Sequence, residues 1–345
     1  QSDMKELKIR LDYRYTEGIN YKIDNLLSIG VLTFAVSVVF ITIVTSFILD
    51  RSEQFSFKLR KLVLWVQVSA PWWIAFGCLT LFVPGQEENS STTWLLDFAH
   101  WHHIDVFNFT SWHSFTLFAA FVYLFYRFGS TVKDGLQQSV AMSNLIDFTN
   151  ATPTVTESLV VYYSLPFKAP AAFTAGLLSP KIYLTTALLD HINQQELDII
   201  VRHELAHVES RDPLYKAIFS ALACFFPVVT KRKLIEHFTL LTEQMADYSV
   251  TATYDNLDVA QTLVNVARMQ RVESEQINRV GCHGIQTSHF GNDQTSVRVH
   301  RLLNPMLPSS WLALGISFLM LASVALLTSS VVDSLHHIIE TFLTH

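Results

Sequence analysis

The chain has 345 residues, of which 50% are hydrophobic and only 16% are charged, and 25 of them are phenylalanines. This composition is too apolar for a disordered chain or for a typical soluble enzyme. The net charge of −6 argues against direct nucleic-acid binding, because such binding needs a basic face. The three cysteines form no C-x-x-C pair, so any metal site must be built from histidines and carboxylates.

Long uncharged stretches dominate both ends of the sequence. A polar segment, residues 1–24, comes first. The stretches that lack Asp, Glu, Lys and Arg lie at 25–49, 62–86, 106–126 and 302–332. Each holds about 20 apolar, helix-compatible residues, which at about 1.5 Å per residue cross a hydrocarbon core of about 30 Å. The sequence therefore predicts an integral membrane protein with four transmembrane helices in the lipid bilayer.

The basic residues predict an orientation for these helices. Segment 50–61 and the start of segment 127–301 carry several lysines and arginines, whereas segment 87–105 and the tail 333–345 carry none. Basic residues accumulate on the cytoplasmic side of membrane proteins, so the first two segments are predicted inside and the other two outside. The side of segment 1–24 stays open, because helix parity places it outside although it contains five basic residues.

These stretches divide the chain into five predicted parts. The parts are an N-terminal segment 1–24, three transmembrane helices over 25–128 with an outer loop at 84–111, a cytoplasmic domain over 129–301, a fourth transmembrane helix over 302–332, and an outer tail over 333–345. The inserted domain is long enough to fold as one unit. Its pattern predicts a helix, short strands around 158–164, 170–175 and 181–186, and then mostly helices. The predicted fold class is mainly α, with an α+β domain between helices three and four.

The inserted domain contains the motif HELAH at residues 203–207. Asn193 and Glu196 form a capping box ahead of it, and apolar residues recur with helical spacing, so the motif is predicted to lie within a helix. That helix is expected to end before Asp212, read as the N-cap of the next helix with Pro213 at its first position. The spacing is that of a metalloprotease zinc site, with Glu204 positioned to act on a water molecule.

A catalytic zinc ion needs a third protein ligand besides His203 and His207. A second amphipathic helix is predicted over 234–250, and it contains Glu243 and, one turn later, Asp247. Glu243 is the predicted third ligand. Asp247 is predicted to accept the outer N–H of a ligating histidine and so to fix its tautomer.

Two parts of this site stay open in the sequence. Glu236 and His237 lie one or two turns before the predicted third ligand and are rivals for its role. A cationic or phenolic group is needed to stabilise the oxyanion of a peptide-cleavage intermediate. The candidates are Tyr248, Arg211 and His289, and spacing does not choose among them.

The reaction that this constellation implies is peptide hydrolysis. Glu204 takes a proton from the attacking water and later delivers it to the leaving amine. The edge of the strands in 158–186 is predicted to hold the substrate as an added strand, because extended backbone pairs with a free sheet edge.

The run PFKAPAAFTAGLLSPKIYLTTALLDHINQQELDIIVRHELAHVESRDPLYK resembles the zinc domain of BlaR/MecR-type membrane metallopeptidases. The order of three spans, a zinc domain and a fourth span is similar too. The resemblance implies a zincin-like protease domain that binds one Zn²⁺ per chain through His203, His207 and Glu243, with Glu204 as catalytic acid and base. It also implies a multi-pass protein of a bacterial-type inner membrane with a cytoplasmic catalytic domain.

Two segments are more similar to the HtpX/Ste24-type membrane proteases. These are EQMADYS, which begins at Glu243, and TSHFGNDQTSVRVHRLL, which ends at Leu303. Both groups belong to a gluzincin-like clan, so the implied zinc site is the same. The tail 333–345 has no room for a penicillin-binding sensor, which argues against β-lactam sensing.

Taken together, the sequence predicts a membrane-embedded zinc endopeptidase that cleaves a protein on the cytoplasmic side. The expected substrate is a transcriptional repressor or another regulator in a signalling pathway. Two alternatives stay open: a quality-control protease of the HtpX/Ste24 type, and a non-catalytic signalling or scaffold protein. Cleavage that depends on Glu204 separates an enzyme from a scaffold.

Overall fold

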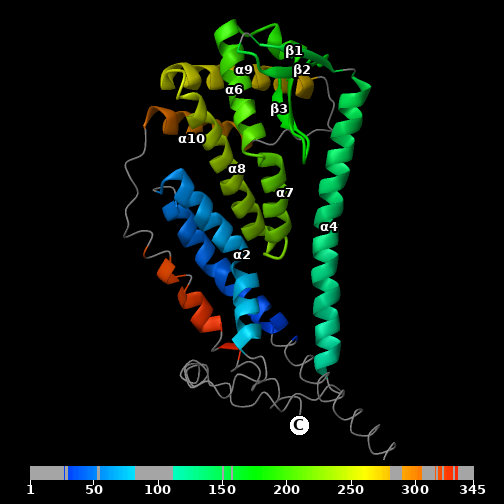
Figure 1. Cartoon of the computed structure of the whole chain (residues 1–345), viewed down its shortest axis with the longest axis vertical. Helices are drawn as coiled ribbons and strands as arrows, with labels where there is room; N and C mark the ends of the chain where they lie inside the picture. Colours follow the sequence, from blue (N-terminus) through cyan, green and yellow to red (C-terminus); the bar gives the residue numbers. More distant parts are fainter. Residues whose placement is uncertain are drawn as a thin grey trace, which may run out of the picture.

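The computed structural model describes residues 27, 30–52, 55–81, 112–149, 151–156, 158–279 and 290–304, and parts of 315–332. Figure 1 shows an elongated molecule with a small sheet and several helices at one end and the N-terminal helices at the other. The long helix α4 runs alongside both. The predicted segment 1–24, the outer loop and the tail lie outside the described residues.

Two helices near the N-terminus are long and apolar enough to cross a membrane, judged by length and composition. They cover Gly30–Ser52 and, as α2, Phe57–Leu81. The second helix contains the uncharged residues from 62 onward and also the charged residues just before them. Among these, Arg60 is buried against protein and donates to Gln244 Oε1 instead of facing lipid.

Helix α4 covers Trp112–Phe148 and runs without a break from the predicted third span into the inserted domain. Its described side chains are mostly exposed, including the aromatic residues Phe118, Phe121 and Phe125. The first residues of the predicted third span and much of the fourth lie outside the described residues. The four-span arrangement therefore stays a prediction, with two candidate spans among the described residues.

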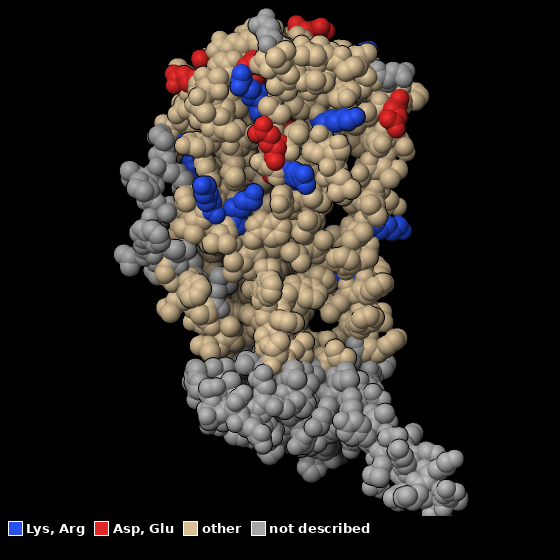
Figure 2. Space-filling view, viewed as in Figure 1, with Lys and Arg blue, Asp and Glu red and all other residues tan. Residues whose placement is uncertain are grey.

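Charged side chains are unevenly distributed over the surface. On the face drawn in Figure 2, they gather over the sheet-bearing end and the middle, and the lower described surface is almost wholly uncharged. Large exposed apolar residues belong to the helices of this lower part, among them Val39, Ile43, Trp73, Phe76 and Phe125. A continuous apolar surface on helices of this length is typical of contact with lipid, which suggests a membrane-associated protein.

The sheet has four strands in the order β1-β2-β4-β3. The strands are β1 (Thr152–Val155), β2 (Val161–Leu165), β3 (Ala172–Ala175) and β4 (Lys181–Thr185). β2 and β4 are parallel, and the two outer pairs are antiparallel. The sequence predicted the last three strands but not β1, whose residues are all exposed and include Pro153. A proline is tolerated in an edge strand, because one side of the strand needs no ladder hydrogen bonds. The exposed residues of β1 also lack the apolar pattern that would predict a strand.

Helices cover the sheet and continue towards the N-terminal helices. They are α5 (Thr186–Leu189), α6 (Gln194–Glu209), α7 (Asp212–Ala223), α8 (Val228–Val250), α9 (Asn256–Arg279) and α10 (Phe290–Leu303). α6 packs on the sheet through Ile200 and Val201, which share a buried cluster with Leu184 of β4. The predicted capping box is present, because the Glu196 N–H donates to Asn193 Oδ1 at 2.8 Å.

The largest apolar core joins the inserted domain to the N-terminal helices. It contains Leu64 and Val68 of α2, Phe219 of α7 and Phe238 of α8. The rings of Phe219 and Phe238 stack with centroids 4.3 Å apart, and Trp65 meets both edge-on. α7 and α8 therefore pack directly on α2, and the inserted domain shares a buried core with the N-terminal helices.

Candidate metal centre

The two histidines of the motif lie within α6, as the sequence predicted. Ile200 and Val201 of this helix are buried in the cluster that it shares with the sheet. His203 and His207 lie one and two turns further along and point towards α8. α8 presents Glu243 to the same space. One ligand atom from each of the three side chains lies within 4.8 Å of the other two.

The distances within this cluster fit a tetrahedral ion. His203 Nε2 lies 3.2 Å from His207 Nε2 and 3.4 Å from Glu243 Oε2, and His207 Nε2 lies 3.6 Å from Glu243 Oε1. Ligands at about 2.0–2.1 Å from a tetrahedral zinc ion are about 3.3 Å apart. The donor set, two imidazoles and a carboxylate, is one that catalytic zinc sites use.

Carboxylates hold the outer nitrogen of each imidazole. His203 Nδ1 donates to Asp247 Oδ1 at 3.0 Å, and His207 Nδ1 donates to Asp212 Oδ2 at 2.7 Å. Each hydrogen bond fixes the tautomer that leaves Nε2 free to bind a cation. The sequence predicted the role of Asp247 but missed Asp212.

Asp212 was missed because it was read as a helix cap. In the structure Arg211 takes the N-cap position in a left-handed conformation with φ 51°, and Asp212 is the first residue of α7. The tight turn between α6 and α7 thereby places the Asp212 carboxylate next to His207. A signal was present in the sequence, since Arg211 and Asp212 form an RD pair shortly after HELAH, within the run that resembles the BlaR/MecR-type metallopeptidases.

Arg298 of α10 completes the charged surroundings. Its Nε and Nη2 donate to the two carboxylate oxygens of Asp247, each at 2.7 Å, and its Nη1 lies 3.3 Å from Glu243 Oε2. Lys216 Nζ lies 3.3 Å from Glu243 Oε1. Sequence reasoning named the segment around Arg298 as similar to the HtpX/Ste24 proteases but did not single out this residue.

The pKa shifts of the cluster follow from these contacts. Burial by itself lowers the pKa of His203, but hydrogen bonds to Asp247 and Glu243 outweigh burial and raise it to about 10. Burial raises the pKa of Glu243, but both histidines and Arg298 outweigh it and hold the pKa well below its usual range. The cluster therefore favours positive charge at the point where the three ligand atoms meet.

Glu204 is held by the edge strand of the sheet. Its side chain is buried, and Thr174 Oγ1 of β3 donates to Glu204 Oε2 at 2.8 Å. The same hydroxyl lies 3.1 Å from the Glu204 carbonyl oxygen. This contact, which the sequence did not predict, ties the carboxylate of the motif to the strand that was expected to bind substrate.

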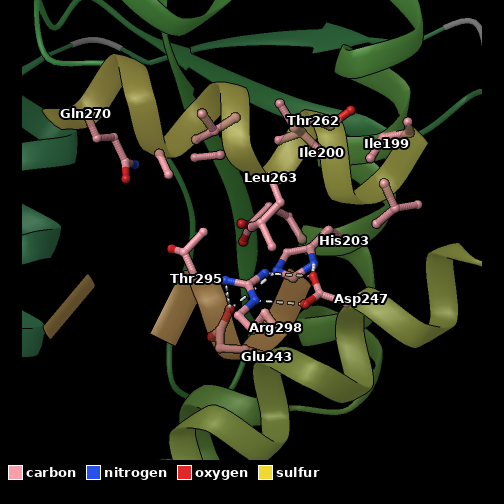
Figure 3. Close-up of a pocket in the computed structure, with 15 residues that line it drawn as sticks. Ile199, Ile200, His203, Glu243, Asp247, Thr262, Leu263, Gln270, Thr295 and Arg298 are labelled. Atoms are coloured by element: carbon pink, nitrogen blue, oxygen red, sulfur yellow. Dashed lines mark hydrogen bonds and ion pairs between the residues drawn. The ribbon is translucent and has the colours of Figure 1, made fainter. Parts of the chain in front are cut away.

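A pocket of about 180 Å³ opens beside the cluster of His203, His207 and Glu243. Figure 3 shows it extending from His203 and Asp247 along α9 towards Gln270. Its walls come from α6, α8, α9, α10 and β3, and they combine polar residues near the histidines with apolar residues. The apolar lining residues are Ala172, Ile199, Ile200, Val259, Leu263, Val266 and Ala267.

The rival ligands and the proposed oxyanion groups lie elsewhere. Glu236 pairs with Arg232 at 3.5 Å, and His237 Nδ1 lies 3.5 Å from Arg60 Nη2 of α2. Neither is part of the described cluster around the histidine pair.

Of the oxyanion candidates, Tyr248 is 64% exposed and its ring packs 5.5 Å from that of Phe57. Arg211 is exposed at the turn before α7, and neither residue is among the described lining of the pocket. His289 lies outside the described residues. Arg298 is the cation that the structure brings to the pocket.

A family comparison covers this part of the chain. Residues 141–300, from the last turns of α4 to α10, match the model of peptidase family M48. This segment is similar to the M48 peptidases. It contains every residue of the described metal cluster, and M48 peptidases are zinc metallopeptidases, so the match indicates a metalloprotease. It does not distinguish the BlaR/MecR type from the HtpX/Ste24 type. No curated protein and no solved structure matches the chain.

Proposed function

We propose that the chain is a membrane-bound zinc endopeptidase. The observation that carries this proposal is the convergence of His203, His207 and Glu243, together with the carboxylates that fix the outer nitrogen of each histidine. Two imidazoles held with Nε2 free, next to a carboxylate, form the donor set of catalytic zinc sites. These three residues would hold one Zn²⁺ per chain.

The chemistry divides between the ion and the protein. Zinc supplies Lewis acidity for the scissile carbonyl and for a water molecule. Glu204 accepts the proton of the attacking water and passes it to the leaving amine, and Thr174 holds its carboxylate in place. Arg298 lies close enough to the pocket to hold a substrate carbonyl, in addition to its contact with Asp247.

The substrate is a polypeptide in extended conformation. β3 is an edge strand, so it has unpaired backbone groups to which a substrate strand can be added. Ala172 of this strand lines the pocket, and Thr174 contacts Glu204. A substrate strand along β3 would pass the metal ligands and place one apolar side chain in the pocket.

The proposed location is a multi-pass inner membrane with the catalytic domain in the cytoplasm. Two candidate spans and the lysine and arginine distribution support this. A cytosolic regulator, such as a transcriptional repressor, is the proposed substrate of an enzyme whose active site lies on that side.

A quality-control protease is the second candidate. The observation that favours it is Arg298, because it binds two acidic residues of the site and belongs to the segment that resembles the HtpX/Ste24 proteases. One defined cytosolic target supports the regulatory role, and many misfolded membrane proteins as substrates support quality control.

The test is the Glu204→Gln variant of the full chain in membranes. It keeps the shape and the ligands but removes the proton acceptor. Zinc content should stay near one per chain, and cleavage should fall by about 10²–10⁴. Glu236→Gln, a substitution of the same type at a partly exposed residue outside the cluster, serves as the control and should cleave normally. Undiminished cleavage by Glu204→Gln would rule out this mechanism, and zinc-bound wild type that cleaves no protein would support the scaffold alternative.

A further inference from the structure

Helix α8 has two functional faces. One face carries Glu243 and Asp247, which contact the histidines of α6. The other buries Leu234, Phe238 and Leu241, spaced by three and four residues, in the core shared with α2. In Figure 1, α8 runs from the N-terminal helices to the sheet-bearing end, and it contacts both α2 and α6. Movement of α8 relative to α2 would therefore also move Glu243, the proposed metal ligand.

The described part of this interface also holds buried polar contacts, centred on Arg60. Arg60 of α2 is 1% exposed, and its Nη1 donates to Gln244 Oε1 at 2.9 Å. Its Nη2 lies 3.5 Å from His237 Nδ1. Gln244 is itself buried and directly follows Glu243 in the chain.

The contact fixes how α8 sits on α2. Apolar packing tolerates small sliding of one helix along another, but a buried guanidinium must keep its hydrogen-bond acceptors because an unpaired buried charge is costly. The charge-assisted bond from Arg60 therefore selects one height and one rotation for Gln244. Because α8 is a continuous helix through this point, the position of Glu243 is selected with it.

We propose that Arg60 is a positioning residue for the metal centre. It acts through Gln244, and it makes the metal affinity of the peptidase domain depend on the position of a candidate membrane span. Movement of α2 against α8 would move Glu243 relative to His203 and His207. This gives the membrane part of the chain a direct route to the active site, and it rests on the proposed role of Glu243 as a zinc ligand.

The experiment measures zinc affinity by chelator competition, using the full chain in detergent or nanodiscs. Arg60→Met and Gln244→Ala should each weaken zinc binding by about 10–100-fold, as losses of supporting groups around metal ligands do. The double variant should be no weaker than Arg60→Met alone, because Arg60→Met already removes the contact with Gln244. Excess zinc should restore peptide cleavage by the single variants. Lys58→Met, which removes an exposed cation from the same helix, is the matched control and should bind zinc as wild type does.

The variant Gln244→Glu guards against loss of folding, because it keeps an acceptor for Arg60. It should fold and bind zinc within a few-fold of wild type. If Arg60→Met and Gln244→Ala unfold more easily but bind zinc with unchanged affinity, Arg60 only stabilises the fold and the proposal is wrong. If wild type itself binds no zinc, the proposed function fails instead, so the two failures are distinguishable.

Discussion

The metal centre and the interface between α2 and α8 are built in opposite ways. In the metal centre, buried polar groups form a continuous set of charged contacts that includes Asp212, Asp247 and Arg298. In the interface, apolar rings do most of the packing, and the buried guanidinium of Arg60 donates to the neutral side chain of Gln244. Substitutions in the metal centre should therefore change metal binding, and substitutions of the apolar rings in the interface should change stability.

The largest effect is expected from removing the carboxylate ligand. Glu243→Ala should lose zinc and all cleavage, because two imidazoles alone make an incomplete site. Glu236→Ala, seven residues earlier on the same helix, should behave as wild type because its partner is Arg232 on an exposed face. Metal analysis of the purified proteins checks this, and a zinc-free Glu236→Ala protein would reverse the assignment.

The next largest effect is expected in the apolar interface between α2 and α8. Phe238→Ala should lower the free energy of unfolding by about 3–5 kcal/mol, because the ring is buried and stacked on Phe219. The folded fraction should still bind zinc through unchanged ligands. Thermal unfolding with and without zinc measures both quantities. Normal stability of this variant would contradict a core shared with α2.

A smaller effect is expected from the carboxylates behind the histidines. Asp212→Ala and Asp247→Ala should each weaken zinc binding by about 10–100-fold, because they orient the imidazoles without binding the ion. Asp255→Ala, which removes an exposed carboxylate near the start of α9, should have no effect. Unchanged zinc affinity for Asp212→Ala would show that His207 does not depend on the turn at Arg211.

The smallest effect concerns substrate choice. Ala267→Phe should fill part of the pocket and lower the cleavage of peptides with a large apolar residue beside the scissile bond by about 10-fold or more. Peptides with alanine at that position should be cleaved nearly as well as by wild type. Kinetics on a matched peptide pair give the ratio, and equal losses for both peptides would mean that the pocket does not select side chains.

The same contrast explains what could be predicted from the sequence. His203, Glu204 and His207 were placed on one helix, and Glu243 was paired with Asp247, because helical spacing is local information. The structure brings Glu243, and not Glu236, to the histidines. Thr174 and Arg298 were missed because their contacts depend on packing between segments far apart in the chain.

The charged residues at the start of α2 have a related explanation. The spans were delimited by charged residues, on the assumption that such residues face lipid or water. Arg60 breaks this rule because protein surrounds it, and its acceptor, Gln244, lies 184 residues further along the chain. β1 was not predicted because its residues are all exposed, and an exposed edge strand has no apolar alternation to detect.

The most direct test of the central claim is zinc-edge X-ray absorption spectroscopy of the purified full chain. The account predicts one zinc ion with two imidazole ligands at about 2.0–2.1 Å, a carboxylate oxygen at about 2.0–2.2 Å and one further light atom. Glu236→Ala should give the same spectrum, whereas purified Glu243→Ala should contain no zinc and give no zinc-edge signal. A sulfur ligand at about 2.3 Å, or a single imidazole in the wild-type spectrum, would contradict a metal centre formed by His203, His207 and Glu243.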